Sequence, residues 1–267
     1  MRKLSEVGFA LSLALLFTWF AFSAKPKAQT SVQQAARGPV VVELFTSEGC
    51  SSCPPADALL RKLEARQSIA GAEIIPLEEH VDYWNHDGWV DPFSSPEWTE
   101  RQQAYVAVAN DDPYTPELVV DGRSQFVGND ARKAEAEIEK AARGVKTEVS
   151  ITAGAADAKG GQSFTVTVGK LTQTSAGDTA EVWLAITEDG LHSSVMRGEN
   201  AGRVLQHVAT LRALRKIGDA DASVPFTANP TIKFASQWNL ADLHVTAFVQ
   251  KKKSREILGA ASTKIKG

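Results

Sequence analysis

The sequence has few cysteines, no excess of charge of one sign, and only one long apolar run. Only two of its 267 residues are cysteines, too few for a disulfide framework or a zinc module of four thiolates. The 29 basic and 32 acidic residues nearly balance, so nothing indicates a nucleic-acid partner. With 43% hydrophobic and 23% charged residues the composition is that of a globular protein, which excludes a disordered or collagen-like chain. At this length we expect two cores of roughly 100 to 150 residues each.

The start of the chain has the pattern of a secretory leader. A basic beginning, MRK, is followed by an apolar run without charges over residues 8–24. We predict a signal peptide over 1–23 and a polar tether over 24–38. An uncleaved anchor is the alternative, because the run is at the short limit for spanning a bilayer. The expected location is therefore periplasmic or secreted, with membrane attachment only through an uncleaved N-terminal segment.

Residues 39–144 have the pattern of an α/β domain. The run VVVELF at 40–45 is apolar on both sides of Glu43, as expected of a central buried strand. Asp121-Gly122 is a strong hairpin signal between two short strands. The predicted order is β-α-β-α-β-β-α, with helices beginning at Pro54, Pro96 and Ala131 and strands over 40–45, 73–81, 117–120 and 125–127.

After residue 144 the pattern changes to short strands separated by turns. The expected strands are 148–152, 163–168, 180–187, 204–214, 231–234, 243–250 and 257–262. Such a series predicts an all-β immunoglobulin-like sandwich over 145–267. Within it, RGEN at 197–200 is interpreted as a turn, with a binding loop as the alternative, and KKKSR at 251–255 as a solvated hairpin tip.

The two cysteines form a Cys-x-x-Cys motif between a strand and a helix. This context places Cys50 at an exposed helix N-terminus, where backbone N–H groups and the helix dipole stabilise a thiolate. Cys50 is the candidate nucleophile in thiol–disulfide exchange. Cys53, one helical turn further on, is the candidate resolving thiol.

Two other interpretations of the pair stay open. The cysteines could form an inert disulfide that fixes the start of the helix. They could also bind Cu(I), whereas a closed zinc site would need two further ligands, for which His80 and His86 are the nearest candidates. Neither spacing indicates a metal, so we predict no metal ligand and no cofactor.

An aromatic loop, HVDYWNHDGW at 80–89, is expected beside the cysteines, because the C-terminal ends of parallel strands meet at one edge of a sheet. Asp82 or His86 could assist proton transfer, whereas His80 is interpreted as structural. The alternative for the aromatic residues is a local core that holds the loop together. The candidates for a substrate-binding wall are Tyr83, Trp84, Trp89 and Trp98.

The order of elements over 39–144, the cysteine motif and Thr115-Pro116 before a strand together resemble the thioredoxin fold. The resemblance implies a cis peptide bond at Pro116, close to the cysteines, and substrate-facing backbone at Thr115. It also implies that Glu43 corresponds to the buried acid that relays protons in thioredoxins, although Glu43 lies one residue further from the first cysteine.

A second resemblance extends over nearly the whole mature chain. The residues that carry it are similar to those of a secreted thioredoxin-like family of unknown function found in proteobacteria: VELFTSEGCSSCPPAD at 42–57, HVDYW at 80–84, Gly88-Trp89, Arg101-Gln102, RGENAGR at 197–203, and His207. We therefore expect an exported thiol–disulfide oxidoreductase that acts on periplasmic protein disulfides, together with an unidentified redox partner. The alternative is a redox-inert binding module, or a Cu(I) carrier, of the cell envelope.

Overall fold

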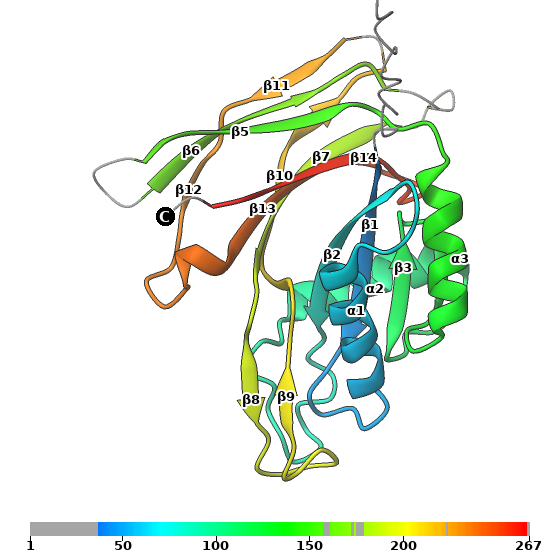
Figure 1. Ribbon diagram of the computed structural model, residues 1–267, viewed down its shortest axis with the longest axis vertical. Coiled ribbons are helices and arrows are strands. Elements are labelled where there is room, and N and C mark those ends of the chain that lie inside the picture. The colour runs from blue at the N-terminus through cyan, green and yellow to red at the C-terminus, as the bar shows by residue number, and fades with distance from the viewer. Residues whose placement is uncertain (1–36, 157–160, 172–173, 175–178, 223, 266–267) are drawn as a thin grey trace, which may run out of the picture. The chain divides into compact units, whose positions relative to one another are not determined.

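The computed structural model describes residues 37–156, 161–171, 174, 179–222 and 224–265 (Figure 1). The predicted signal peptide over 1–23 lies outside these residues, as does the tether apart from its last two positions. The described residues belong to one compact unit.

The first region of the chain has three helices and four strands. They are β1 (Gly38–Thr46), α1 (Pro54–Arg66), β2 (Ala72–His80), α2 (Pro96–Ala109), β3 (Glu117–Val120), β4 (Ser124–Val127) and α3 (Ala131–Ala142). Strand β1 pairs in parallel with β2 and antiparallel with β3, and β3 pairs with β4. The strand order in this region is therefore β2-β1-β3-β4.

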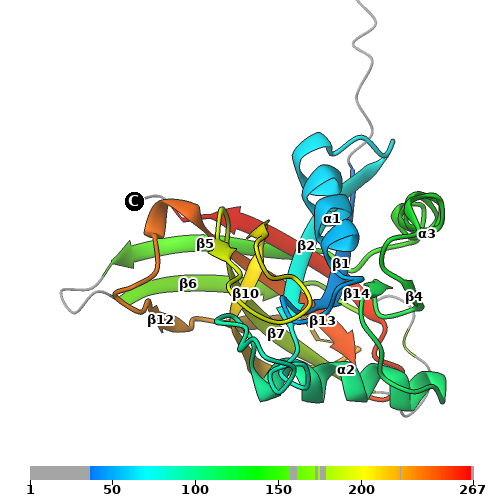
Figure 2. The same cartoon turned by 90° about the horizontal axis from the view of Figure 1, so that it is seen from below.

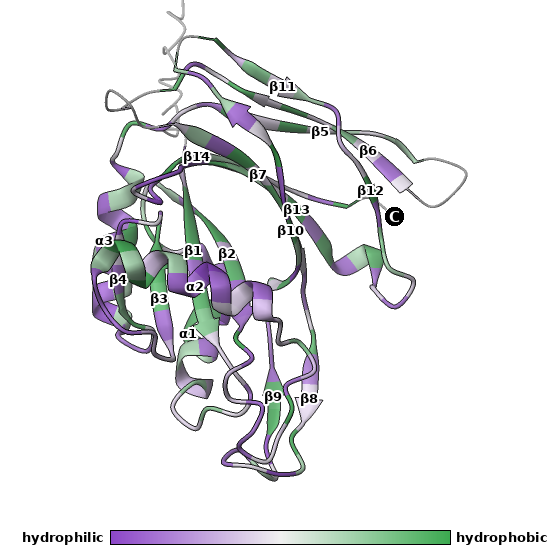
Figure 3. Ribbon diagram, turned by 180° about the vertical axis from the view of Figure 1, so that it is seen from behind, coloured by the Kyte–Doolittle hydropathy of each residue, from purple (hydrophilic) through white to green (hydrophobic). Residues whose placement is uncertain are grey.

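Strand β1 is buried on both faces because helices cover both sides of the sheet (Figure 2). Val40, Val42 and Leu44 pack with residues of α1 and α3. The alternating residues Val41 and Phe45 face the side of α2. Figure 3 shows β1 as hydrophobic along most of its length, whereas the visible face of α2 is largely hydrophilic.

The helix ends are where the sequence signals place them. Pro54 opens α1 with Cys53 as its N-cap, and the Ser95 hydroxyl at the N-cap of α2 accepts the Glu97 backbone N–H at 3.2 Å. Helix α3 begins after Asp130, whose carboxylate accepts the Lys133 backbone N–H at 3.0 Å. Helix α1 therefore begins directly after the second cysteine.

The second region is almost entirely β. Its elements are β5 (Val149–Ala156), β6 (Gly161–Val168), β7 (Ala180–Glu188), β8 (His192–Ser194), β9 (Val204–Gln206), β10 (Thr210–Ala220), β11 (Phe226–Ala228), β12 (Thr231–Lys233), the short 3₁₀ helix η1 (Leu240–Asp242), β13 (Leu243–Lys251) and β14 (Ile257–Lys264). Inner residues of β6 pack on those of β7 and β13, which forms a second core between two sheets.

The larger sheet crosses the boundary that the sequence suggested at residue 145. Its eight strands run in the order β14-β13-β7-β10-β2-β1-β3-β4. The regions join where Thr210 of β10 pairs with Glu78 of β2, and the Glu78 backbone N–H donates to the Ala209 carbonyl at 2.9 Å. The two regions therefore share one sheet instead of each having its own, which differs from the expected separate sandwich over 145–267.

One predicted strand is divided in the structure. The run at 204–214 forms the end of the β8–β9 hairpin and the beginning of β10, with Ala209 at a φ of 48° between them. This break places His207 at the point where the shared sheet meets the first region.

Candidate functional site

We call residues 47–53 the cysteine loop; it connects β1 to α1 and ends at the N-cap of that helix. Cys50 and Cys53 form a disulfide. The Cys53 backbone N–H donates to the Cys50 carbonyl at 3.2 Å, which gives the loop a tight turn. Cys53 is the N-cap of α1, and Cys50, which was expected at the helix N-terminus, lies three residues before that cap. The expected exposure is wrong, because both cysteines are 0% exposed.

Thr115 and Pro116 lie against this loop, and the peptide bond between them is cis. The Ser52 hydroxyl donates to the Thr115 carbonyl at 3.4 Å and lies 3.3 Å from the Cys50 Sγ atom. The start of β3 is therefore held next to the disulfide, as the resemblance implied.

Two residues of the aromatic loop also contact the cysteine loop. The Trp84 Nε1–H donates to the Thr115 Oγ1 atom at 2.8 Å, and the Trp89 Nε1–H donates to the Glu48 Oε2 atom at 2.8 Å. The Tyr83 hydroxyl donates to Gln102 of α2 at 3.2 Å and also lies near the Thr115 side chain. Trp84 and Trp89 therefore border the disulfide, and their indole N–H groups are occupied within the protein.

Other residues singled out from the sequence do not gather here. Trp98 is buried in the core between α2 and the shared sheet, which agrees with the alternative interpretation of this tryptophan as structural. His86 is exposed and pairs with its neighbour Asp87 at 3.5 Å. Asp82 binds the Thr99 hydroxyl at 2.6 Å on α2.

Glu43 belongs to a separate buried network. Its Oε1 atom accepts the Arg101 Nε–H at 2.6 Å, and its other oxygen accepts the Tyr105 hydroxyl. Burial raises the pKa of Tyr105 well above its usual value, against the charge of Arg101. These partners lie on α2, so the structure does not bring Glu43 to the cysteine loop, which the resemblance had implied.

A hairpin from the second region covers the disulfide. We call residues 192–206, from β8 to β9, the cover hairpin. Glu199 at its tip accepts the Ser51 backbone N–H at 3.1 Å. The Asn200 Nδ2 group donates to the carbonyls of Glu48 at 2.8 Å and Cys50 at 3.0 Å. The segment interpreted as a turn thus also holds the cysteine loop, and this contact explains why the cysteines are buried.

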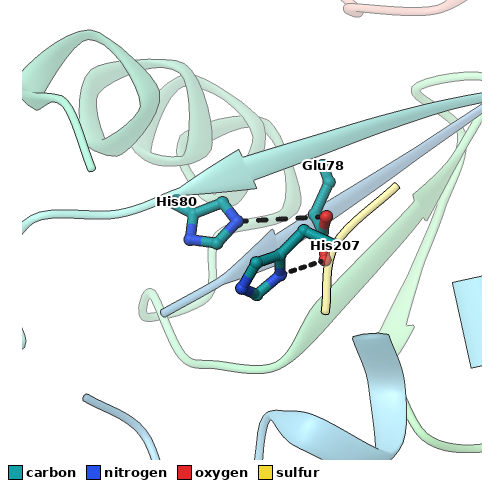
Figure 4. A group of neighbouring side chains, drawn as sticks. All are labelled: Glu78, His80 and His207. Atoms are coloured by element: carbon teal, nitrogen blue, oxygen red, sulfur yellow. Dashed lines mark hydrogen bonds and ion pairs between the residues drawn. The ribbon is translucent and has the colours of Figure 1, made fainter. Parts of the chain in front are cut away.

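Five buried side chains, two histidines and the three acids around them, lie next to the cysteine loop. We call them the histidine cluster: Glu48, Glu78, His80, Asp91 and His207. His80 ends β2 and His207 precedes β10, and their ring centroids lie 4.6 Å apart. Figure 4 shows both rings beside the carboxylate of Glu78. The pairing of β2 with β10 therefore brings together residues that are far apart in the sequence.

Each ring has one nitrogen near Glu78 and the other against a second acid. His207 Nδ1 lies 3.2 Å from Glu78 Oε1, and His80 Nε2 lies 3.9 Å from Glu78 Oε2. On the outer sides, His80 Nδ1 lies 2.7 Å from Asp91 Oδ2, and His207 Nε2 lies 3.0 Å from Glu48 Oε1. The cluster is thus a chain of alternating acids and histidines that ends two residues before Cys50.

The electrostatics of the cluster follow from burial and mutual contact. Burial would lower the pKa of His207, but the charge of Glu78 and the bond to Glu48 raise it to about 9. Burial would likewise raise the pKa of Glu78, but the charge and hydrogen bond of His207, together with the charge of His80, lower it to about 2. At neutral pH the cluster is therefore a set of ion pairs.

Asp57 is the buried acid next to Cys53 on the same face of α1. Its backbone N–H donates to the Cys53 carbonyl at 3.2 Å, and its Oδ1 atom accepts the Thr46 hydroxyl at 2.6 Å. Burial, followed by the charge of Glu78, raises the pKa of Asp57 to about 7. An acid one turn after the second cysteine, with such a pKa, can exchange a proton near neutral pH.

Comparison with protein families identifies the chain. Residues 41–250 match the family described as "Protein of unknown function (DUF1223)". The chain belongs to this family. No curated protein sequence matches it significantly.

Two solved structures resemble this DUF1223 chain over most of its length. A protein from Agrobacterium tumefaciens is 26% identical with a TM-score of 0.66, and the alignment covers 86% of this chain and 96% of that one. HBP35 of Porphyromonas gingivalis is 17% identical with a TM-score of 0.63, covering 87% of this chain and 77% of that one. Within the described ranges, no helix of the DUF1223 chain has the length and apolar character needed to cross a membrane.

Sequence reasoning missed several residues of this DUF1223 site. Asp57 and Asn200 were quoted only within motifs, and Glu48 was considered only as an opposing charge beside the cysteines. The spacing of Asp57 from Cys53 was the available signal, because residues four apart share a helix face. No local signal could have found Glu78, since its partner His207 comes from the other region.

Proposed function

We propose that this protein is an exported thiol–disulfide oxidoreductase acting on protein disulfides of the bacterial envelope. One observation carries the proposal: Cys50 and Cys53 form a disulfide at the N-terminus of α1, with the Thr115 carbonyl held beside it by Ser52. The strand order β2-β1-β3-β4, with helices on both faces, supports a thioredoxin-like arrangement of the first region. The leader-like pattern at the N-terminus supports export.

The chemistry follows from the geometry of the pair. In the reduced protein the Cys50 thiolate attacks a substrate disulfide, which forms a mixed disulfide and releases one substrate thiolate. The Cys53 thiolate then attacks the Cys50 Sγ atom, which restores the internal disulfide and releases the second substrate thiolate. The substrate gains two electrons and the pair loses two. The Asp57 carboxylate, on the same helix face as Cys53, accepts the proton from the Cys53 thiol.

The surroundings of the disulfide fit an extended peptide. The Thr115 backbone lies beside the sulfur atoms, and Trp84 and Trp89 form an aromatic border. Val90, which follows Trp89 in the chain, and Met196, in the hairpin between β8 and β9, are exposed apolar residues, with 67% and 73% of their area accessible. A partly unfolded protein segment is the substrate class that such a border favours.

The cover hairpin favours a second candidate function. Because Glu199 and Asn200 hold the cysteine loop and bury both cysteines, a substrate reaches the disulfide only if the hairpin moves. An inert disulfide in a binding module of the envelope would need no such movement. The two candidates differ in whether the cysteines exchange with external thiols.

Trapping of mixed disulfides tests the proposal directly. The reduced protein is expected to reduce a disulfide-bonded test protein, Cys53→Ser to accumulate a covalent complex with it, and Cys50→Ser to do neither. Ser150→Ala is the matched control, because this exposed serine of β5 contacts Thr167 in the second region and its variant is expected to turn over normally. Turnover by Cys50→Ser, or no complex with Cys53→Ser, would contradict the proposal and favour the binding module.

A further inference from the structure

The centre of the histidine cluster has the donor set of a metal site. Ligand atoms of Glu78, His80 and His207 all lie within 4.8 Å of one another. Ligands of a tetrahedral zinc ion lie about 3.4 Å apart, given zinc–ligand distances of about 2.0–2.2 Å. The separations of 3.2 Å and 3.9 Å between Glu78 and the two rings lie on either side of this value. These ligand atoms are close enough for a small cation to bind all three residues after the side chains shift toward it.

An unpartnered nitrogen points into this centre. The His80 side chain is 0% exposed, and in the described part of the chain its Nε2 atom has no hydrogen-bond partner. Leaving a buried polar atom unpaired costs about 1–3 kcal/mol. The nearest acceptor, Glu78 Oε2, lies 3.9 Å away and already accepts the Val208 backbone N–H at 3.0 Å. A cation between His80 and Glu78 would satisfy both groups.

The outer sides of the rings have the arrangement found around metal-bound histidines. A histidine ligand usually donates its other ring N–H to a carboxylate, which fixes the tautomer and orients the ring. Asp91 occupies this position for His80, and Glu48 occupies it for His207. Each of these acids accepts a further hydrogen bond. The Glu48 backbone N–H donates to Asp91 at 2.8 Å, and the Trp89 indole N–H donates to the Glu48 side chain at 2.8 Å.

Charge and burial indicate which cation the cluster suits. Three acids and two imidazoles lie buried together, so a divalent cation that replaces the two imidazolium protons keeps the same net charge in the cluster. Imidazole and carboxylate ligands suit zinc, and a closed, buried set of ligands is typical of structural zinc sites. A surface pocket of about 420 Å³ that is lined by His207, His192 and Glu64 offers an approach for the ion.

We propose that Glu78, His80 and His207 form a binding site for a divalent transition-metal ion of the zinc class. Glu48 and Asp91 orient the two histidines as positioning residues. The ion joins β2 to the segment before β10, and so joins the two regions next to the cysteine loop. This inference does not depend on the proposed exchange reaction, because none of its ligands is a cysteine.

Metal titration of the oxidised protein, purified after expression of the full chain, tests the site. The protein is stripped with a chelator and titrated with Zn²⁺ in competition with a chromophoric chelator. The expected result is one Zn²⁺ per chain, with affinity reduced about tenfold or more in Glu78→Gln, His80→Gln and His207→Gln. His86→Gln is the matched control, since His86 is exposed and lies outside the cluster. The Cys50→Ser, Cys53→Ser double variant is expected to bind as the wild type does.

A second measurement needs no variant of the ligands. Co²⁺ bound to the stripped wild-type protein is expected to give visible absorption without a sulfur-to-metal charge-transfer band, and Zn²⁺ is expected to raise the melting temperature. No binding at a large molar excess of Zn²⁺, or binding that His86→Gln weakens as much as His207→Gln does, would overturn the proposal. A thiolate band, lost in the double cysteine variant, would place the metal on the cysteines and overturn it as well. Failure of exchange at the cysteines would leave these results unchanged.

Discussion

Glu78 and Glu79 are neighbours on β2, are equally buried at 0% exposure, and lie in opposite electrostatic surroundings. Consecutive strand residues point to opposite faces, so Glu78 meets the histidines and Glu79 meets Arg101 on the α2 side. The histidines outweigh burial and lower the pKa of Glu78 to about 2. Burial and the charge of Glu43 raise the pKa of Glu79 well above its usual value, against the single charge of Arg101. The number of partners, and not the depth of burial, therefore decides which carboxylate is charged.

The two faces of β2 also differ in the residues that lie against them. The face of Glu78 carries hydrogen-bonded histidines, the cysteine loop and the cover hairpin. On the face of Glu79, Arg101 is shared between two acids, and neither oxygen of Glu79 has a hydrogen-bond partner among the described residues. We therefore place the chemistry on the first face and a structural ion-pair network on the second.

The largest effect is expected at Arg101. Arg101→Met removes the cation that faces both Glu43 and Glu79, and should lower the free energy of unfolding by about 3–5 kcal/mol in urea denaturation. Arg143→Met is the control: Arg143 pairs with Glu139 on the exposed face of α3, and its loss should cost less than about 0.5 kcal/mol. Similar losses in the two variants would show that the buried network contributes no more than a surface pair.

Opposite signs are expected for the two neighbouring glutamates. Glu78→Gln removes the acid between two histidines and should lower the free energy of unfolding by about 3 kcal/mol. Glu79→Gln replaces a carboxyl group that the folded protein holds protonated but the unfolded chain ionises at pH 8, and should raise the free energy of unfolding by about 1 kcal/mol. Both are measured by urea denaturation at pH 8 with a chelator present, so that bound metal does not contribute. Equal losses of stability in the two variants would contradict the opposite pKa shifts of Glu78 and Glu79.

Glu117 is another buried acid, and its raised pKa makes the effect of burial measurable as a change of stability with pH. Burial raises the pKa of Glu117 to about 7, and Gln102 donates to it at 2.8 Å. The pKa of Glu117 is higher in the folded protein than in the unfolded chain, so the unfolded chain loses this proton at a lower pH. The free energy of unfolding therefore falls as pH rises from the unfolded-state pKa through about 7. The gain in stability of Glu117→Gln over the wild type should therefore grow by on the order of 2 kcal/mol between pH 5 and pH 8. A difference that does not change with pH would contradict the raised pKa.

The smallest effect concerns the cover hairpin. Asn200→Ala removes the bonds to the carbonyls of Glu48 and Cys50, which should cost about 1 kcal/mol and speed reduction of the disulfide by dithiothreitol. The exposed Asn129→Ala serves as control and should leave the rate unchanged. If Asn200→Ala is reduced no faster than the wild type, the hairpin does not limit access to the cysteines.

Local patterns predicted most individual elements of the first region. The central strand at 40–45 and the hairpin at Asp121-Gly122 are present, and both turn residues have positive φ values of 48° and 65°. These features depend on neighbouring residues alone, which is why the sequence reveals them. The helix starts at Pro54 and Pro96 are present for the same reason.

Long-range pairing could not be predicted in the same way. Nothing near residue 210 in the sequence indicates that β10 pairs with β2, so neither the shared sheet nor the histidine cluster was expected. The contacts of Glu43 with Arg101 and Tyr105 on α2 were not predicted either, because a strand pattern shows alternation without showing which face each residue occupies. The hairpin at 192–206 covers the cysteines through Asn200, a contact between residues 150 positions apart.

The measurement that tests the central claim most directly is the redox equilibrium of the cysteine pair. The purified protein is equilibrated in graded thiol–disulfide buffers, and its free thiols are counted by alkylation. The account predicts rapid exchange and a reduction potential between about −120 and −270 mV, the range of catalytic dithiols. A potential below about −300 mV, or no exchange, would contradict the account and make the pair a structural disulfide.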